Sequence, residues 1–252
     1  MATILLVRHG ENDWVKKHRL AGWLPGVHLN ENGHRQARAA AERLAGLPLR
    51  AVYSSPVTRC METAVYLAET HNLDVIPLDD VGEVRYGAWE GKKIKKLARE
   101  PLWRVVQFFP SRMRFPEGEA LREVQFRAVQ ALEMLSARHK DATIAVVSHA
   151  DLIKLVLAHY LGVHVDLFQR IAVSPGSVSI IDLPDNGMVR VQRVNDDGPL
   201  RPPPQPEPKP KKAEKKHKKA AKKAKKVKKK ATTVSAVEGA PAPLLAAVDE
   251  EE

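Results

Sequence analysis

The chain has little of what several protein classes require. It contains one cysteine, Cys60, among 252 residues, which excludes an internal disulfide framework and is typical of a reducing compartment. No apolar run approaches the ~20 residues needed to cross a bilayer. The first residues, MATILLVRHG, lack the basic start and longer apolar stretch of a secretory signal peptide. We therefore expect a soluble, cytoplasmic protein with no membrane partner.

Positive charge is concentrated at one end of the chain. The net charge is +11, and segment 201–252 holds 15 Lys/Arg and 7 Asp/Glu, so it carries eight of those charges. Its composition is proline-rich, then Lys/Ala-rich, then acidic, with too few bulky apolar residues to form a core. We predict a folded domain over 1–198 and a disordered tail over 199–252. Two hypotheses fit the tail: it is a solubilising appendage, or it is an electrostatic tether that binds nucleic acid or polyphosphate without specificity.

Short apolar runs alternate with amphipathic segments in the predicted domain. Residues 3–7 and 143–147 are continuously apolar, which favours strands buried on both faces of a parallel sheet. Weaker strand patterns lie at 51–54, 74–78, 177–183 and 188–194. Apolar residues recur at helical spacing in 31–45, 119–138 and 151–161. Ser55 followed by Pro56 is typical of a capped helix start. The alternation predicts an α/β fold with mostly parallel strands.

Polar side chains follow four of the predicted strands. In chain order they are Arg8, His9, Arg59, Glu83 and His149. In parallel α/β sheets the ligand crevice lies beyond the carboxyl ends of the strands. We therefore expect these side chains to meet at one edge of the sheet.

The segments around these residues form an ordered set. After the opening RHGE come AGWLPGVHLNENGHRQA, YSSPVTRCMETA, GEVRYGAWEG, FPEGEALREV and VVSHADLIK. They cover most of residues 3–161. RHG alone is a weak signal, whereas the full order and spacing are specific. The chain resembles the histidine phosphatase (phosphoglycerate mutase-like) superfamily.

The resemblance implies both a fold and a set of roles. The fold is a three-layer α/β/α sandwich around a mostly parallel sheet. The chemistry implied needs no metal and no other cofactor, with His9 as nucleophile, Glu83 as general acid and His149 as a second catalytic imidazole. The implied substrate-binding positions are Arg8, Arg59, Asn12 and Gly22.

The chemistry of these residue types agrees with the implied roles. A neutral imidazole nitrogen can attack phosphorus and later release it, which divides one difficult displacement into two. Two guanidiniums and a second imidazole can match the charge on the phosphoryl oxygens. Glu83 must begin protonated if it is to protonate the leaving oxygen and then activate water. A dianionic substrate raises the pKa of that carboxyl and nearby arginines lower it, so the sequence leaves the balance open.

Two positions depart from the pattern common in the family. Asn12 stands where Thr or Ser is usual, and Val15 where Asn is usual. Asn12 can still donate a hydrogen bond to phosphate, whereas Val15 cannot, so substrate identity is more in doubt than reaction type. We expect Cys60 to be buried as a small apolar residue.

Segment 92–118 is expected to cover the pocket mouth and to set substrate choice. Its candidate contact residues are Phe108, Phe109, Arg112, Arg114 and Phe115. We expect a phosphatase for a small phosphorylated metabolite. One alternative is a phosphoglycerate-type phosphomutase, although 92–118 does not resemble the insert of those enzymes. Another is a nucleic-acid- or polyphosphate-tethered regulator with a weak phosphatase site. The ester and the oligomeric state stay open.

Overall fold

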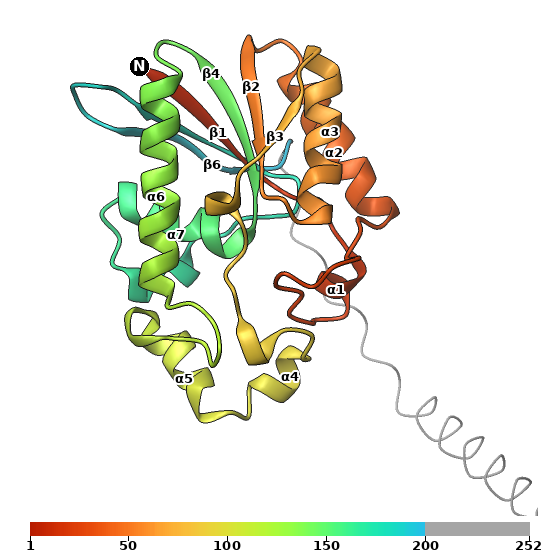
Figure 1. Cartoon of the computed structure of the whole chain (residues 1–252), viewed down its shortest axis with the longest axis vertical. Helices are drawn as coiled ribbons and strands as arrows, with labels where there is room; N and C mark the ends of the chain where they lie inside the picture. Colours follow the sequence, from red (N-terminus) through yellow and green to blue (C-terminus); the bar gives the residue numbers. More distant parts are fainter. Residues whose placement is uncertain (200–252) are drawn as a thin grey trace, which may run out of the picture. The chain divides into compact units, whose positions relative to one another are not determined.

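The computed structural model describes residues 1–199, which form a six-stranded sheet with helices on both faces (Figure 1). The strands are β1 (Ala2–Arg8), β2 (Leu49–Ser54), β3 (Val75–Pro77), β4 (Thr143–Ser148), β5 (Val178–Leu183) and β6 (Arg190–Asp196). Their order across the sheet is β3-β2-β4-β1-β5-β6. The pairs among β1 to β4 are parallel, and β5 and β6 are added antiparallel. The predicted α/β/α sandwich with a mostly parallel sheet is therefore confirmed.

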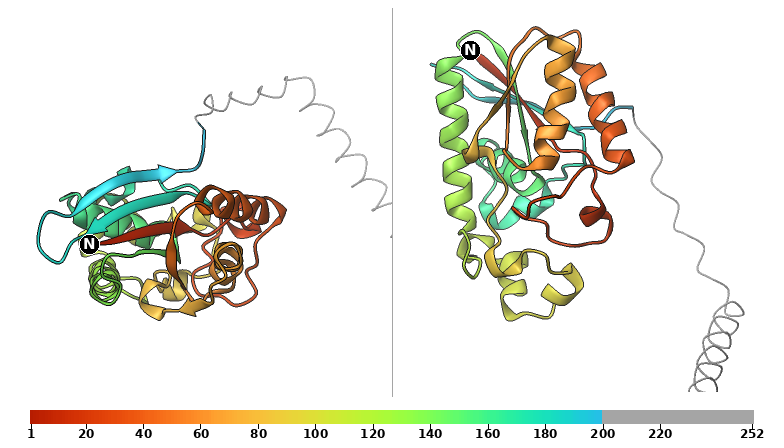
Figure 2. Two further views of the ribbon diagram at one scale, coloured as in Figure 1. Left: turned by 90° about the horizontal axis from the view of Figure 1, so that it is seen from above. Right: turned by 45° about the vertical axis from the view of Figure 1, so that its right-hand side comes forward.

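Two helical layers cover the sheet (Figure 2). Helices α2 (Glu31–Leu44) and α3 (Thr58–His71) pack on one face. Helices α6 (Leu121–Arg138) and α7 (Ala150–Tyr160) pack on the other. The shorter helices are α1 (Asp13–Lys16), α4 (Ile94–Leu97) and α5 (Pro101–Phe108). The 3-10 turns are η1 (Asp79–Val81), η2 (Gly87–Trp89), η3 (Pro110–Arg112) and η4 (Val165–Arg170).

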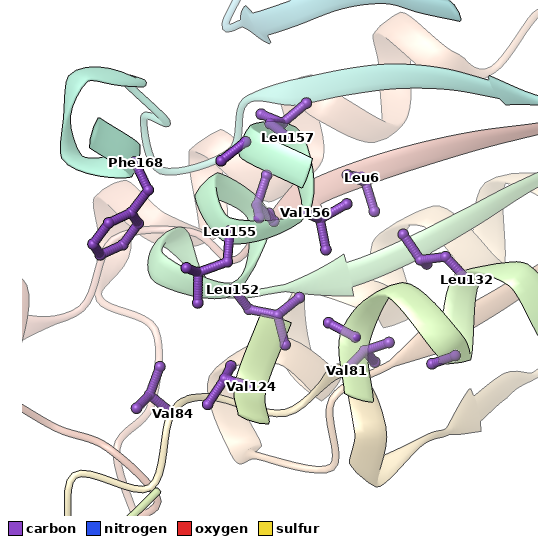
Figure 3. Packing of buried hydrophobic residues seen from close by; sticks show 14 of the residues in the cluster. Leu6, Val81, Val84, Val124, Leu132, Leu152, Leu155, Val156, Leu157 and Phe168 are labelled. Carbon is purple, nitrogen blue, oxygen red and sulfur yellow. The ribbon is translucent and has the colours of Figure 1, made fainter. Parts of the chain in front are cut away.

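The continuous apolar run of β1 follows from its central place in the sheet. Successive strand side chains point to opposite faces, so a strand covered on both sides needs apolar residues throughout. Ile4 and Leu6 join the cluster beneath α6 and α7, whereas Leu5 and Val7 join the cluster beneath α2 and α3. Figure 3 shows Leu6 among the side chains of the first cluster, which include Leu132. The parallel register with β4 brings Arg8 level with Ser148.

One predicted helix start is wrong. Helix α3 begins at Thr58, and its N-cap is Val57, which makes no side-chain capping bond. The Ser55 hydroxyl lies instead 2.8 Å from Nε2 of His149. The same hydroxyl accepts only a long hydrogen bond, of 3.4 Å, from the backbone N–H of Val57, so its shorter contact is with the histidine that follows β4. The predicted tail, 199–252, lies outside the described residues apart from Pro199. None of the helices described in residues 1–199 has the length and hydropathy of a transmembrane span.

Candidate active site

The polar groups predicted to meet do so at the carboxyl edge of the sheet. His9 follows β1, Arg59 lies in the first turn of α3 after β2, and His149 is the N-cap of α7 after β4. A cavity of about 430 Å³ opens there. The predicted residues that line it are Arg8, His9, Asn12, Gly22, Arg59 and Glu83. His149 lies directly behind them and is fully buried.

His9 is held as a neutral imidazole with one unprotonated ring nitrogen. Its Nδ1 lies 2.7 Å from the carbonyl oxygen of Gly10, which can only accept, so Nδ1 carries the hydrogen. Its Nε2 accepts from Nε of Arg59 at 3.2 Å. Burial, and then the positive charges of Arg59 and Arg8, hold the pKa of His9 well below its usual range. The ring therefore offers an unprotonated nitrogen to the cavity at neutral pH.

The chain path through Gly10 and Gly22 requires glycine. A Cβ on Gly10 would lie 2.4 Å from the backbone oxygen of Gly33 in α2, so the strand end could not approach that helix. Gly22 has a φ of +53°, in the left-handed region that favours glycine. Its carbonyl accepts from Nη2 of Arg59 at 3.0 Å. Gly22 thus orients a guanidinium through its backbone.

Arg59 connects the two imidazoles and the candidate acid. Beyond its contacts with His9 and Gly22, its Nη2 donates to Nδ1 of His149 at 3.0 Å and lies 3.8 Å from Oε2 of Glu83. The His9 and His149 rings meet edge to face with centroids 5.2 Å apart. A side chain that is 1% exposed therefore fixes the geometry of the whole cluster.

Three buried nitrogen donors at the cavity have no hydrogen-bond partner within the described residues. They are Nε of Arg8, Nη1 of Arg59 and Nδ2 of Asn12. The other ends of these side chains are fixed. Nη1 of Arg8 donates to the carbonyl of Val173 at 2.6 Å, and the amide oxygen of Asn12 caps α1. Because a buried donor without an acceptor is costly, three of them around His9 indicate an anionic ligand.

His149 is also neutral in the free protein. Arg59 donates to its Nδ1, so Nε2 carries the hydrogen and donates to the hydroxyl of Ser55. Burial and then Arg59 hold the pKa of His149 well below its usual range. Because both imidazoles are neutral, the positive charge of the cluster comes from the arginines. Cys60 is buried as predicted, with its Sγ 3.3 Å from Nε2 of His149, and burial raises the pKa of its thiol to about 12.

Glu83 sits on a loop that is anchored through its backbone. Its carbonyl oxygen accepts from Nε1 of Trp23 at 2.7 Å and from Nη2 of Arg127 at 3.0 Å. Its carboxylate oxygen Oε2 lies 3.5 Å from Nδ1 of His149. Burial raises the pKa of Glu83 to about 7, and the nearby carboxylate of Asp151 adds to the rise. Arg59 acts in the opposite direction, but the loss of hydration is the larger effect.

Several side chains at the site were not found by sequence reasoning. Arg127 on α6 holds the carbonyls of Asp80 and Gly82 as well as that of Glu83. Tyr86 donates from its hydroxyl to Oδ2 of Asp151 at 2.9 Å, and both line the cavity. None of these contacts has a local sequence signal, because each joins elements far apart in the chain.

The prediction for segment 92–118 is mostly wrong. Of that segment only Ile94 lines the cavity. Phe115 is buried against Tyr86 and Trp89, whereas Phe108 and Phe109 are exposed elsewhere. Of the other two predicted contacts, Arg112 lies over the ring of Phe109, and Arg114 forms an ion pair with Glu123. Of these five residues Phe115 supports the cavity wall, because it packs against Tyr86, which lines the cavity.

Two further features bear on how the cavity is used. A larger cavity, of about 530 Å³, lies between α6, α7 and η4, and it contains none of the predicted site residues. Within residues 1–199, no group of three or more His, Cys, Asp or Glu side chains is placed as metal ligands. The converging donors make the smaller cavity the candidate site.

Comparison with known proteins identifies phosphatase relatives of this chain. Over 186 residues the chain is 33% identical to phosphoserine phosphatase 1 of Hydrogenobacter thermophilus, covering 73% of this chain and 87% of the relative. It is 35% identical over 159 residues to the metal-independent phosphoserine phosphatase of Arabidopsis thaliana, covering 61% and 66%. It spans 54% of the length of mycobacterial relatives that it matches at 34% identity.

A solved structure gives the same fold. YhfR of Bacillus stearothermophilus superposes with a TM-score of 0.73 at 28% identity, covering 78% of this chain and 98% of that one. The sequence profile of the histidine phosphatase superfamily (branch 1) matches residues 4–197. That match spans the sheet, both helical layers and the cavity. The chain therefore belongs to the histidine phosphatase superfamily.

Proposed function

We propose that this chain hydrolyses a small phosphomonoester without a metal ion, and that His9 takes up the phosphoryl group. Phosphatase activity on a small phosphorylated metabolite, through a phosphohistidine, goes with membership of the superfamily and with its phosphatase relatives. The metal independence and the role of each residue are our proposal. Phosphoserine is named for two relatives, so it comes first in a substrate panel.

One observation carries the proposal. An unprotonated imidazole nitrogen lies beside Arg59, in a cavity where three buried donors lack acceptors among residues 1–199. A phosphoryl group presents three oxygens, which can accept from Arg8, Arg59 and Asn12 while His9 approaches phosphorus. Two guanidiniums supply the positive charge that other phosphoryl-transfer enzymes take from a metal.

The first step forms the phosphohistidine. Nε2 of His9 donates its lone pair to phosphorus as the bond from phosphorus to the ester oxygen breaks. The electron pair of that bond leaves with the oxygen, and the protonated carboxyl of Glu83 gives that oxygen its proton. An alcohol departs, and Glu83 is left as a carboxylate.

The second step restores the enzyme. The Glu83 carboxylate accepts a proton from water as the water oxygen bonds to phosphorus, and the nitrogen–phosphorus bond breaks toward His9. Inorganic phosphate leaves, and Glu83 is again protonated. The pKa of about 7 suits both steps, since neither the acid nor the base form of the carboxyl is scarce near neutral pH.

The test is phosphate release from a metabolite panel by the full chain, with and without a chelator. We expect release to survive the chelator and to be lost in His9→Ala. Mass spectrometry of acid-labile phosphate should place the trapped group on His9. The matched control is His28→Ala, because His28 is exposed and pairs with Glu62 away from the cluster. Release that persisted in His9→Ala would refute the proposed nucleophile, and loss on chelation would refute metal independence.

Product analysis separates hydrolysis from the mutase alternative. A phosphatase releases free phosphate, whereas a mutase returns phosphate from His9 to the same carbon skeleton. We expect free phosphate as the main product from every hydrolysed ester. An isomerised phosphate ester from 3-phosphoglycerate as the main product would favour the mutase.

The charge of segment 201–252 supports a second proposal, concerning partners. We propose that this segment, which lies outside the described residues, binds nucleic acid or polyphosphate without sequence preference in the cytoplasm. It carries eight of the eleven net positive charges, nearly all as lysine and without aromatic residues. The full chain should shift RNA and polyphosphate on a gel at low salt, with affinity that falls steeply at higher salt. Binding that is insensitive to salt would refute the proposal.

A further inference from the structure

The cavity contains charged groups that contact neither the phosphoryl group nor the leaving oxygen in the proposed chemistry. Besides Arg8, Arg59 and Glu83, its charged lining consists of Arg19, Asp151 and Lys154. Arg19 has a structural role, because its Nε and Nη2 donate to the carbonyl of Gly91 and its guanidinium lies 4.5 Å from the ring centre of Trp14. Asp151 and Lys154 remain, one acid and one ammonium on the same helix.

Asp151 and Lys154 are held in place but keep spare hydrogen-bonding capacity. Oδ2 of Asp151 accepts from Tyr86, and Oδ1 lies 3.3 Å from Nζ of Lys154. Nζ of Lys154 also donates to Oε1 of Gln169 at 3.1 Å. A carboxylate offers about four acceptor sites and an ammonium has three hydrogens, so each group can take at least one further partner. Their side chains are 24% and 16% exposed, which leaves both within reach of a ligand in the cavity.

The pair lies close to the phosphoryl position along α7. His149 is the N-cap of α7, and Asp151 and Lys154 follow it by two and five residues, or about 3 Å and 7.5 Å along the helix axis. Helical side chains lean toward the N-terminus, so Lys154 leans back toward His149. An ester bound with its phosphate at His9 would place a short head group against this pair.

We propose that Asp151 and Lys154 select a phosphate ester whose alcohol carries an ammonium and a carboxylate on one carbon, of which O-phosphoserine is the simplest. Asp151 accepts from the ammonium, and Lys154 donates to the carboxylate. This inference rests on the proposed function, because it needs the phosphate at His9. The two residues are three positions apart on a helix, and their ion pair is partly exposed. Such a pair contributes little free energy, so replacing part of it with contacts to the ligand costs little.

The same pair disfavours head groups of one sign. An ester with a carboxylate but no ammonium brings a second negative charge next to Asp151. An ester with an ammonium but no carboxylate leaves Lys154 facing a like charge. Only the zwitterion meets both partners with opposite charge, and a site with fixed polar groups rejects an analogue that leaves one of them unpaired.

The test compares four esters with the full chain. They are O-phosphoserine, 3-phosphoglycerate (hydroxyl in place of ammonium), O-phosphoethanolamine (no carboxylate) and p-nitrophenyl phosphate (neither group). Asp151→Asn should reduce the ratio of kcat/KM for phosphoserine over 3-phosphoglycerate by about tenfold or more. Lys154→Met should do the same to the ratio for phosphoserine over phosphoethanolamine. Each ratio is taken within one variant, so a change in the chemical step cancels and only active, folded enzyme is scored.

An exposed ion pair of the same kind provides the controls. Lys140 and Asp185 lie 3.1 Å apart at the opposite, amino end of β4, remote from the cavity lining. Lys140→Met and Asp185→Asn should leave both ratios unchanged. Should Asp151→Asn prove inactive, Asp151→Ser is compared in its place.

The outcomes separate this inference from the function on which it rests. Unchanged ratios in both cavity variants would make the ion pair purely structural and would overturn the inference. Hydrolysis of p-nitrophenyl phosphate through phosphorylated His9, without preference for phosphoserine, would also overturn it while leaving the proposed function intact. Absence of hydrolysis of all four esters and of a phosphohistidine would overturn both.

Discussion

The replacement Glu83→Gln tests the chemistry most directly. Glu83 has a pKa of about 7, raised first by burial and then by Asp151, despite Arg59 at 3.8 Å. A general acid works only in its protonated form. The rate kcat/KM, which reports the free enzyme, should therefore fall as the pH rises through about 7. A glutamine of the same shape neither donates this proton nor titrates, so the variant should lack that fall.

The size of the effect follows from the leaving group. Two pH units above its pKa, about 1% of the carboxyl is protonated, so wild-type kcat/KM for an alkyl ester should be down about a hundredfold at pH 9. At pH 6, Glu83→Gln should lose about 10²- to 10⁴-fold on the same ester, the usual contribution of general acid catalysis. For p-nitrophenyl phosphate the loss should be much smaller, because nitrophenolate leaves without a proton.

The assay is kcat/KM between pH 5 and 10 for an alkyl and an aryl ester. Using kcat/KM restricts the comparison to formation of the phosphohistidine, and avoids the later step in which Glu83 acts as a base. Glu69→Gln is the matched control, since Glu69 is exposed on α3. Equal losses on both esters, or a fall near pH 7 that persists in Glu83→Gln, would show that another group donates the proton.

Three further predictions concern the groups around Glu83. The pKa of Glu83 rises from an ordinary 4.5 to about 7 on folding, so the folded state retains a proton that the unfolded chain releases. The free energy of unfolding should therefore drop by about 3 kcal/mol as the pH rises from 4.5 to 7. Thermal unfolding at pH 5 and pH 8 should show most of this drop in the wild type and not in Glu83→Gln. Ser55→Ala should lower kcat about tenfold, because Nε2 of His149 loses its oxygen acceptor, whereas Ser55→Thr should restore activity if the hydroxyl is what matters. Arg127→Met should lower both the melting temperature and the rate on alkyl esters, because three loop carbonyls lose their donor; an unchanged rate would mean that the loop holds Glu83 without it.

The fold could be predicted because its signals are local. An apolar run such as 3–7 is costly anywhere except in a strand covered on both faces, and the helical stripes of 31–45 and 119–138 fit only elements with one buried side. All three predicted elements are present in the structure, and their ends differ from the predicted ones by no more than two residues. The helix start at Ser55 failed because its hydroxyl has a better partner in His149, which no local pattern reveals.

The candidate site likewise contains residues that the sequence predicts and residues that it does not. His9, Arg59 and His149 could be placed because each follows a strand, and parallel strands end at one edge. The residues that contact the Glu83 loop and Asp151 could not be predicted in this way. Tyr86 reaches Asp151 across 65 residues of chain, and Arg127 reaches the Glu83 loop from a helix 44 residues away. Their place in the site depends on how α6 and α7 pack, and a strand–helix pattern does not specify that packing.

Charge balance ties binding to catalysis at this site. Below pH 7 the cluster presents the positive charges of Arg8 and Arg59 with two neutral imidazoles and a protonated Glu83, which together match a phosphate dianion. Above pH 7 the Glu83 carboxylate lies 3.8 Å from the guanidinium that the phosphate needs, so it competes for Arg59 at the pH where it also ceases to be an acid. One ionisation therefore weakens substrate binding and removes the proton donor together. A bound dianion reverses this by raising the pKa of Glu83, so substrate binding favours the protonation state that the first step requires.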